Sequence, residues 1–320
     1  MRRLAIFALT LLSIFFVRVP STRAWGCKGH QTVAYLAEKH LSVEAQKMVD
    51  TLLLANPIEP SLKRFCDNTG LDEMANSATW ADDYRSVDKS TEGWHFIDIP
   101  LSALQDQVDQ YCELGSCVTQ AISKHLAILK DRTQSGANRA MALRFIIHFV
   151  GDLHQPLHDS TNNDRGGNCV PVKYLQQNPH SHGAFYTPNL HHVWDTELVE
   201  SAMTDPDPKA FANTLDTEFS SSYAAWQQGG IQLDAWAWDG HQHALDIVYG
   251  ALNPRIVAEP LDPHAKACTD DRNIGDRMLH KHIVVGPTYR EQAVPVIEER
   301  LAQAGIRLAM ILNDAAKSNP

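Results

Sequence analysis

Residues 137–153 limit how this chain can fold more than any other segment, because they are apolar on almost every side of a helical pattern. Such a pattern predicts a helix buried at the centre of the protein. The segment nevertheless carries His148 and Asp152, which are four residues apart and therefore share one helix face. A buried carboxylate without a partner costs several kcal/mol. We therefore expect Asp152 to face a strong positive charge.

Most of the remaining chain also has helical periodicity. Apolar residues spaced three and four apart predict helices at 31–39, 43–54, 119–129, 208–227, 234–252 and 289–317. No repeat, charge block or Gly/Ser linker divides the chain. We expect an all-α protein: a single mainly helical domain with long loops and at most a short β-hairpin.

The loops are expected where Pro, Gly, Asn and Asp accumulate, at 55–75, 159–190 and 253–287. Extended signals are few. Residues 94–99 and 169–175 are compatible either with a short strand pair or with loops, and the sequence leaves both possibilities open.

The first 24 residues have the pattern of a secretory signal peptide. A basic start precedes a short apolar run, and small residues precede Trp25. The apolar run is too short to span a bilayer, and no later window reaches about 18 apolar residues. We expect cleavage between Ala24 and Trp25. The mature domain, 25–320, would then be a secreted or periplasmic monomer without a membrane anchor.

The charge balance excludes nucleic-acid binding through a basic surface stripe. The formal net charge is −10, and removing residues 1–24 takes away four arginines and no acid, which lowers it to −14. A protein this acidic must hold an anionic substrate through a few strong local charges. Metal ions are the obvious source of such charge.

The six cysteines indicate disulfides, because an even number behind a signal peptide favours three bridges. Zinc–thiolate sites are the weaker alternative, since no paired C-x-x-C spacing occurs. Cys112 and Cys117 enclose a tight loop, so we expect them to pair with each other. The other pairings stay open, with Cys27–Cys66 and Cys169–Cys268 as the first choice.

A second histidine–aspartate pair with the same spacing is His191 and Asp195. One such pair is commonly a surface ion pair, whereas two pairs in a His-rich chain, one of them inside an apolar helix, favour a metal site. Imidazole nitrogen and carboxylate oxygen are ligands that zinc accepts, with Mn²⁺ or Fe²⁺ as alternatives. Pro156 ends the central helix, so His158 can fold back toward the same site.

Six short motifs follow one another over nearly the whole mature chain. They are Trp25-Gly-Cys-Lys-Gly-His30, Trp80-Ala-Asp82-Asp-Tyr-Arg85, Trp94-His95-Phe-Ile-Asp98, His148-x-x-x-Asp152-x-x-x-x-x-His158, Gly166-Gly-Asn168 and Asn189-Leu-His191-x-x-Trp-Asp195. Each alone is weakly specific, but together they resemble the S1/P1 nuclease family of zinc-dependent single-strand nucleases and 3′-nucleotidases. The resemblance implies the helical fold that this family shares with zinc-dependent phospholipase C. It also implies single-stranded DNA, RNA and nucleotides as substrates and 5′-phosphates as products.

The same resemblance implies a cluster of three zinc ions. One zinc would be held by Asp82, His95, His148 and Asp152. A close neighbour would be held by His30, by Asp152 as a bridge, and by the α-amine and carbonyl of Trp25. The third would be held by His158, His191 and Asp195. Nine residues for three ions leave positions open for water and phosphate, as catalytic zinc requires.

Roles in catalysis and base recognition are likewise implied by the resemblance. Asp82 would orient the attacking hydroxide, and Arg85 would stabilise charge on the phosphoryl oxygens. Phe96 would stack on a base, a contact worth about 1–3 kcal/mol. Asp98 and Asn168 would hydrogen-bond the base edge. As structural alternatives, Phe96 would belong to the core and Asn168 would serve the Gly-Gly turn.

Two features depart from the family pattern. His154 and His192 are additional histidines beside ligand positions, where we expect them to tune the site rather than to bind metal. The loop 176–188, with His180 and His182, is longer than in the better-known fungal members. It lies between ligands, and we expect it to cover the cleft.

Two other functions compete with the nuclease. A zinc-dependent phospholipase C is disfavoured by Asp98 and Asn168, because a lipid head group offers no base edge. A non-enzymatic zinc-binding protein would need the ligands but not Arg85.

Overall fold

The computed structural model describes residues 25–62, 65–112, 115–182, 185–260, 268 and 280–317. The expected signal peptide, residues 1–24, lies outside the described residues. The first described helix, α1 (Cys27–Glu38), begins two residues after Trp25.

The central helix is α6 (Gly136–Asp152), as the apolar pattern predicts. Ser135 caps its first turn by accepting a hydrogen bond from the backbone N–H of Asn138. All its residues from Ala142 onward are buried. It packs against α1, α2 (Val43–Ala55), α3 (Glu73–Ser77), α4 (Trp80–Tyr84), α5 (Val118–Lys130) and α13 (Pro287–Lys317). Its buried polar residues therefore lie where several segments meet.

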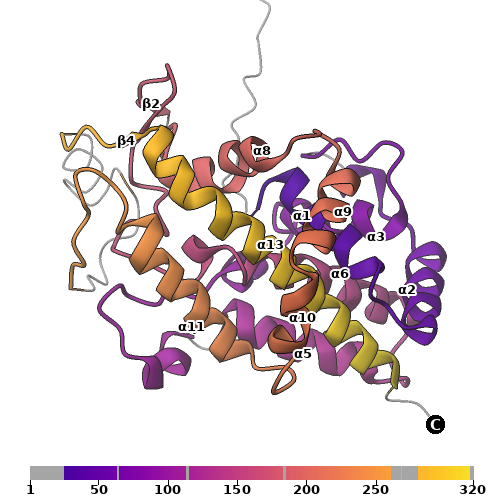
Figure 1. Ribbon diagram of the computed structural model, residues 1–320. Helices are drawn as coiled ribbons and strands as arrows, with labels where there is room; N and C mark the ends of the chain where they lie inside the picture. The colour runs from indigo at the N-terminus through magenta and orange to yellow at the C-terminus, as the bar shows by residue number, and fades with distance from the viewer. Residues whose placement is uncertain are drawn as a thin grey trace, which may run out of the picture.

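Other helices surround this centre. The 31-residue α13 runs diagonally across the molecule in Figure 1 and packs against α1, α2 and α6. The other helices of the described residues are α7 (Leu190–His192), α8 (Leu198–Ala202), α9 (Pro208–Glu218), α10 (Tyr223–Trp226) and α11 (Leu233–His243). Shorter 3₁₀ turns are η1 (Pro60–Leu62), η2 (Lys89–His95), η3 (Gln105–Tyr111), η5 (Pro156–His158) and η7 (Ser220–Ser222), and η6 (Val193–Glu197) and η8 (Ala244–Val248) are π-helical. The domain is mainly helical, and none of the described helices has the length and apolar character needed to cross a membrane.

The expected helices are confirmed, with two refinements. Segment 208–227 is divided into α9, η7 and α10, and segment 234–252 is α11 followed by the π-helical turn η8. The expected loop 55–75 also contains η1 and the start of α3.

Two short strand pairs occur among the described residues, one more than the expected hairpin. β2 (His180–His182) and β3 (Phe185–Thr187) form an antiparallel hairpin, which projects from the helical body near the start of α13 (Figure 1). β1 (Lys173–Tyr174) pairs in parallel with β4 (Val284–Val285). Segment 94–99 forms no strand: it ends η2 and then continues in extended conformation.

Three disulfides join the expected partners: Cys27–Cys66, Cys112–Cys117 and Cys169–Cys268. The first ties the start of α1 to the segment before α3. It therefore holds residue 65 beside the N-terminal end of the described chain.

Candidate metal centre and nucleotide cleft

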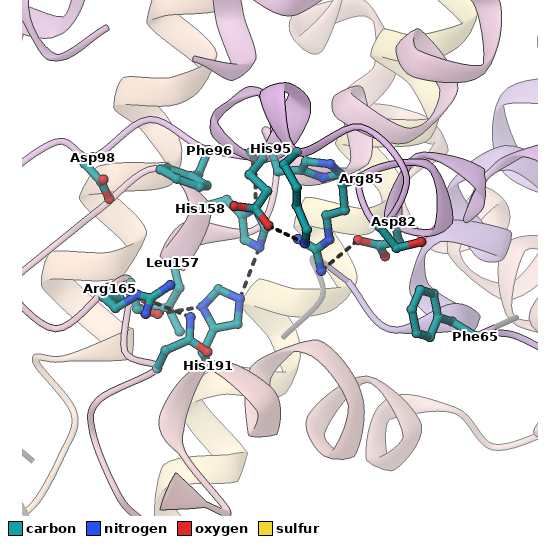
Figure 2. A pocket seen from close by; sticks show the side chains of 15 residues that line it. Phe65, Asp82, Arg85, His95, Phe96, Asp98, Leu157, His158, Arg165 and His191 are labelled. Carbon is teal, nitrogen blue, oxygen red and sulfur yellow. Dashed lines mark hydrogen bonds and ion pairs between the residues drawn. The ribbon is translucent and has the colours of Figure 1, made fainter. Parts of the chain in front are cut away.

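Eight of the nine expected metal ligands bring their side chains together beneath one cleft. The cleft has a volume of about 370 Å³, and Figure 2 shows side chains from widely separated segments lining it. The eight side chains form three groups whose ligand atoms lie within 4.8 Å of one another: His30, His148 and Asp152; Asp82, His95 and His148; and His158, His191 and Asp195. All of them are buried.

The first group joins α1 to α6. His30 Nε2 lies 3.3 Å from Asp152 Oδ1, and the His30 ring stacks on His148 with 4.1 Å between ring centroids. This close approach depends on Gly151: a β-carbon there would lie 2.7 Å from His30 Nδ1. A glycine one residue before the buried carboxylate thus makes room for the imidazole.

The second group adds α4 and the end of η2. His95 Nδ1 lies 2.9 Å from Asp152 Oδ2, and His148 Nε2 lies 3.2 Å from the same oxygen. His148 Nδ1 donates a hydrogen bond to the carbonyl of Ala78 at 2.7 Å. Its Nε2 therefore carries the lone pair and points at the carboxylates of Asp152 and, at 3.9 Å, Asp82.

The third group contains the second histidine–aspartate pair. His158 Nδ1 donates to the carbonyl of His95 at 2.7 Å, and His191 Nδ1 donates to the carbonyl of Gly166 at 2.6 Å. The two Nε2 lone pairs consequently face each other at 3.2 Å, and Asp195 Oδ2 lies 3.2 Å from His191 Nε2. Gln155 Nε2 donates to the other oxygen of Asp195 at 2.6 Å.

Imidazole lone pairs therefore face carboxylate oxygens and one another. Hydrogen-bond acceptors in such contact are unfavourable unless a cation lies between them. Buried atoms without a hydrogen-bond partner include His30 Nε2, His95 Nε2, Asp152 Oδ1 and Asp195 Oδ2. Such atoms cost free energy when they are left unpaired, and a metal ion removes that cost. Lone pairs of neutral imidazoles beside carboxylates are the donor set of zinc. The residues thus fit the metal that the sequence implies.

The electrostatics of the rings agree with metal binding. Burial lowers the pKa of His30 and His158, and that of His95 to about 4, which keeps these rings neutral. Burial also disfavours a charged His148, yet Asp152 and Asp82 raise its pKa overall. A positive charge is therefore stabilised where the first two groups meet.

The carboxylates depend on their neighbours in opposite ways. Burial alone would raise the pKa of Asp152, but His148, His30 and His95 hold it well below its usual range. Burial raises the pKa of Asp195 well above its usual range, and Gln155 only partly offsets this effect. Among the described residues, no positive charge offsets the burial of Asp195, whereas a metal ion would supply one.

The expected catalytic pair lies in the cleft. Asp82 is on α4, and Arg85 follows the last residue of that helix. The two side chains meet at 3.1 Å between Arg85 Nη2 and Asp82 Oδ1 (Figure 2). Burial opposes ionisation of Asp82, but Arg85 and His148 lower its pKa overall. The guanidinium group therefore borders both the metal groups and the open space of the cleft.

One wall of the cleft has the features of a base pocket. Phe96 and Asp98 are exposed and alternate with buried Ile97 and Ile99, because successive side chains of an extended segment point to opposite sides. Phe96 lines the cleft at 37% exposure, so it does not belong to the core.

Asn168 lies on the Gly-Gly turn of the same wall. Its Nδ2 donates to the carbonyl of Arg165 at 2.8 Å, while its Oδ1 is buried without a partner. A β-carbon on Gly166 would lie 2.4 Å from the carbonyl oxygen of Leu157, so this turn requires glycine there. The turn thus places Asn168 on the lining of the cleft with an amide oxygen that has no donor.

The remaining sequence-predicted residues lie elsewhere or keep an untested role. Trp25 is fully buried, and chelation by its α-amine stays a prediction. His154 accepts a hydrogen bond from Arg307 of α13 at 2.9 Å, and His192 lies 3.5 Å from Glu197. Neither belongs to a metal group.

Where it is described, the β2–β3 hairpin contributes no residue to the cleft lining, so the expectation that loop 176–188 covers the cleft is not supported.

Sequence reasoning missed several residues of the site. Gln155, which orients Asp195, lies between a helix end and a proline, at an unspecified position of the 148–158 motif. Phe65 and Lys89 line the cleft but have no distinctive spacing. Of these two, Phe65 alone had a signal, because its neighbour Cys66 was expected to pair with Cys27 of the N-terminal motif.

Comparisons with known proteins agree with this geometry. The S1/P1 nuclease family model matches residues 25–317. Nuclease S1 of Aspergillus oryzae is 31% identical over 312 residues, which cover 93% of this chain and 94% of that protein. Nuclease P1 of Penicillium citrinum is 29% identical over 307 residues, covering 91% and 97%. Endonuclease 2 of Arabidopsis thaliana is 28% identical over 313 residues, covering 92% and 91%.

Proposed function

This chain belongs to the S1/P1 nuclease family, and from this premise we propose that it hydrolyses single-stranded DNA and RNA to 5′-nucleotides and removes 3′-phosphates from nucleotides. One observation carries the proposal. Three groups of buried metal-ligand atoms converge beneath a cleft whose wall contains an exposed aromatic ring and an amide oxygen without a hydrogen-bond partner. The first feature serves phosphate chemistry, and the second serves recognition of a base.

We assign three zinc ions per chain, one to each group. His148 offers only its Nε2 and would hold the ion of the Asp82–His95 group, while His30, Asp152 and the Trp25 α-amine and carbonyl would hold its neighbour. Zinc bound in this way activates water and neutralises developing charge on phosphoryl oxygens. The carbonyls of Ala78, His95 and Gly166 fix the orientation of three ligand rings before any ion binds. The positive charge of the ions would also allow the mature chain, with a net charge of −14 after loss of residues 1–24, to hold a polyanion.

Asp82 and Arg85 act on the reacting group from one side of the cleft. The Asp82 carboxylate accepts a hydrogen bond from the attacking water and orients it toward phosphorus. The Arg85 guanidinium donates to the phosphoryl oxygens and opposes the charge that grows there. The direct contact between the two side chains fixes their relative position before substrate arrives.

Phe96, Asp98 and Asn168 bind the base. Phe96 offers a ring face for stacking, and Asn168 Oδ1 and the Asp98 carboxylate accept hydrogen bonds. We therefore expect the pocket to select bases through N–H donors on their edges. A paired base has its edge occupied and its faces stacked, so duplex DNA should be a poor substrate.

The proposed cellular setting follows from the N-terminal pattern. We infer a signal peptide at 1–24 and a secreted or periplasmic monomer. The three disulfides and the start of the family match at residue 25 support this inference.

The test uses protein that starts at Trp25 and is loaded with zinc. We expect release of 5′-mononucleotides from single-stranded DNA, a much lower rate on duplex of the same sequence, phosphate release from 3′-AMP, and loss of all activity with a chelator. Equal rates on both DNA forms would refute the base pocket. Release of phosphocholine from lipid without nucleotide release would instead favour the phospholipase.

A further inference from the structure

Arg165 occupies an unusual place in the segment that builds the site. Residues 151–172 are all described, and Arg165 is the only exposed residue among them. Its φ of 57° lies in the left-handed region, which few residues other than glycine adopt. A segment that buries nearly every other side chain thus places one arginine outward, on the lining of the cleft.

The backbone of Arg165 connects it directly to the base pocket. Its carbonyl oxygen accepts hydrogen bonds from the backbone N–H of Asn168 at 3.3 Å and from Asn168 Nδ2 at 2.8 Å. The peptide that orients the base-binding amide therefore also carries the guanidinium group. A base held by Asn168 would have Arg165 as its neighbour.

Arg165 also lies on a different side of the cleft from Arg85, the arginine assigned to the reacting phosphate. In Figure 2, Arg165 lies near Leu157 and His191, whereas Arg85 lies beside Asp82, with His158 between the two arginines. Arg85 contacts Asp82, and the third cation of the lining, Lys89, contacts Glu92 at 2.7 Å. The two arginines of the lining therefore lie on different sides of the cleft, with His158 of the third metal group between them.

A nucleotide in this cleft has two ester positions. Its 3′-phosphate must reach the metal groups, and its base occupies the pocket at Phe96 and Asn168. The 5′ end of the same sugar then leads away from the metals. We propose that Arg165 binds the 5′-phosphate of the nucleotide whose base lies in this pocket, and so favours polynucleotides over 3′-mononucleotides. This inference rests on the proposed function.

The chemistry of the residue suits that role. A guanidinium donates two parallel hydrogen bonds to a phosphate, and each lost phosphate contact reduces the salt dependence of single-strand binding by about 0.7 in a log–log slope. A 3′-mononucleotide has no 5′-phosphate and gains nothing from Arg165. A nucleoside 3′,5′-bisphosphate has both groups and no second base, so it isolates the contact.

The experiment compares hydrolysis of the 3′-phosphate in 3′-AMP and in adenosine 3′,5′-bisphosphate. For the unmodified protein we expect kcat/KM to be about five- to tenfold higher on the bisphosphate at low salt. Arg165→Gln should remove this advantage and leave kcat/KM on 3′-AMP within about twofold, while Arg165→Lys should restore part of it. The glutamine keeps a β-carbon at the same φ, so the backbone is not further strained.

Arg132→Gln is the matched control, because Arg132 is exposed and does not line the cleft. It changes the net charge equally and should keep the full preference. A preference that survives in Arg165→Gln, or that is lost equally in Arg132→Gln, would overturn the inference. If the unmodified protein hydrolyses 3′-AMP but shows no preference, the inference fails and the proposed function stands. If it hydrolyses neither compound, both fail.

Discussion

Gly151→Ala should disable the metal centre while leaving the fold intact. Gly151 lies inside α6, immediately before Asp152, and the His30 ring packs over it. An added β-carbon would lie 2.7 Å from His30 Nδ1, whereas ordinary contacts begin near 3.4 Å. The ring must therefore retreat by about 0.7 Å. It cannot do so freely, because its other face stacks on His148.

Gly151→Ala is expected to affect activity much more than the free energy of unfolding. Replacing glycine by alanine within a helix ordinarily stabilises by about 0.5–1 kcal/mol. Overpacking a buried site costs about 1–3 kcal/mol, so the net loss is small compared with typical folding stabilities. A displacement approaching 1 Å at a catalytic site can lower the rate about 100-fold. We therefore expect a folded protein that has lost one zinc per chain and about 10- to 100-fold in kcat/KM.

The assay measures zinc per chain by elemental analysis, kcat/KM on 3′-AMP, and the thermal midpoint. Gly136→Ala is the control on the same helix, because its β-carbon would meet nothing closer than Asn56 Nδ2 at 3.9 Å. It should leave all three quantities nearly unchanged. Full zinc content and activity within twofold in Gly151→Ala would show that His30 does not need its observed position.

Three further predictions address the base pocket, the N-terminus and acid stability. Asp98→Ala should raise KM for nucleotides roughly tenfold with unchanged zinc content, since Asp98 belongs to no metal group; zinc loss would contradict the base-pocket assignment. One extra residue before Trp25 should remove one zinc and nearly all activity, because it blocks the α-amine, whose ordinary pKa is about 7.7–8.0. Full activity with that extension would show that each chain binds two zinc ions and not three. Burial disfavours the Asp216 carboxylate, but hydrogen bonds from Lys39, Tyr223 and His40 lower its pKa to about 2. The lowered pKa stabilises the fold above about pH 4, and this contribution is lost as the pH falls from about 4 to 2. Unfolding by urea should therefore show that Asp216→Asn loses less stability than the unmodified protein over that range. The expected difference is below about 1 kcal/mol, because solvent screens this partly exposed group of charges. Parallel pH profiles would contradict this reading.

Local sequence determined the features that depend on spacing along one segment. The apolar pattern around His148 and Asp152 was sufficient to predict a buried central helix, because helical periodicity fixes which side chains share a face. The same spacing identified His191 and Asp195, although their segment proved to be partly π-helical. The two longer disulfides were only first choices in the sequence, because spacing along the chain does not determine which distant cysteines meet.

Tertiary structure alone decided the contacts between segments. The carbonyls that orient three ligand rings, the hydrogen bond from Gln155 to Asp195 and the parallel pairing of β1 with β4 join residues far apart in sequence, so no local pattern encodes them. Segment 94–99 shows the difference well. Its composition allowed a strand, but its backbone hydrogen bonds go to 158–161 and to Val118, and Phe96 and Asp98 line the cleft. Exposure of Arg165 within a buried segment has the same origin, since burial depends on what packs against a residue and not on its neighbours along the chain.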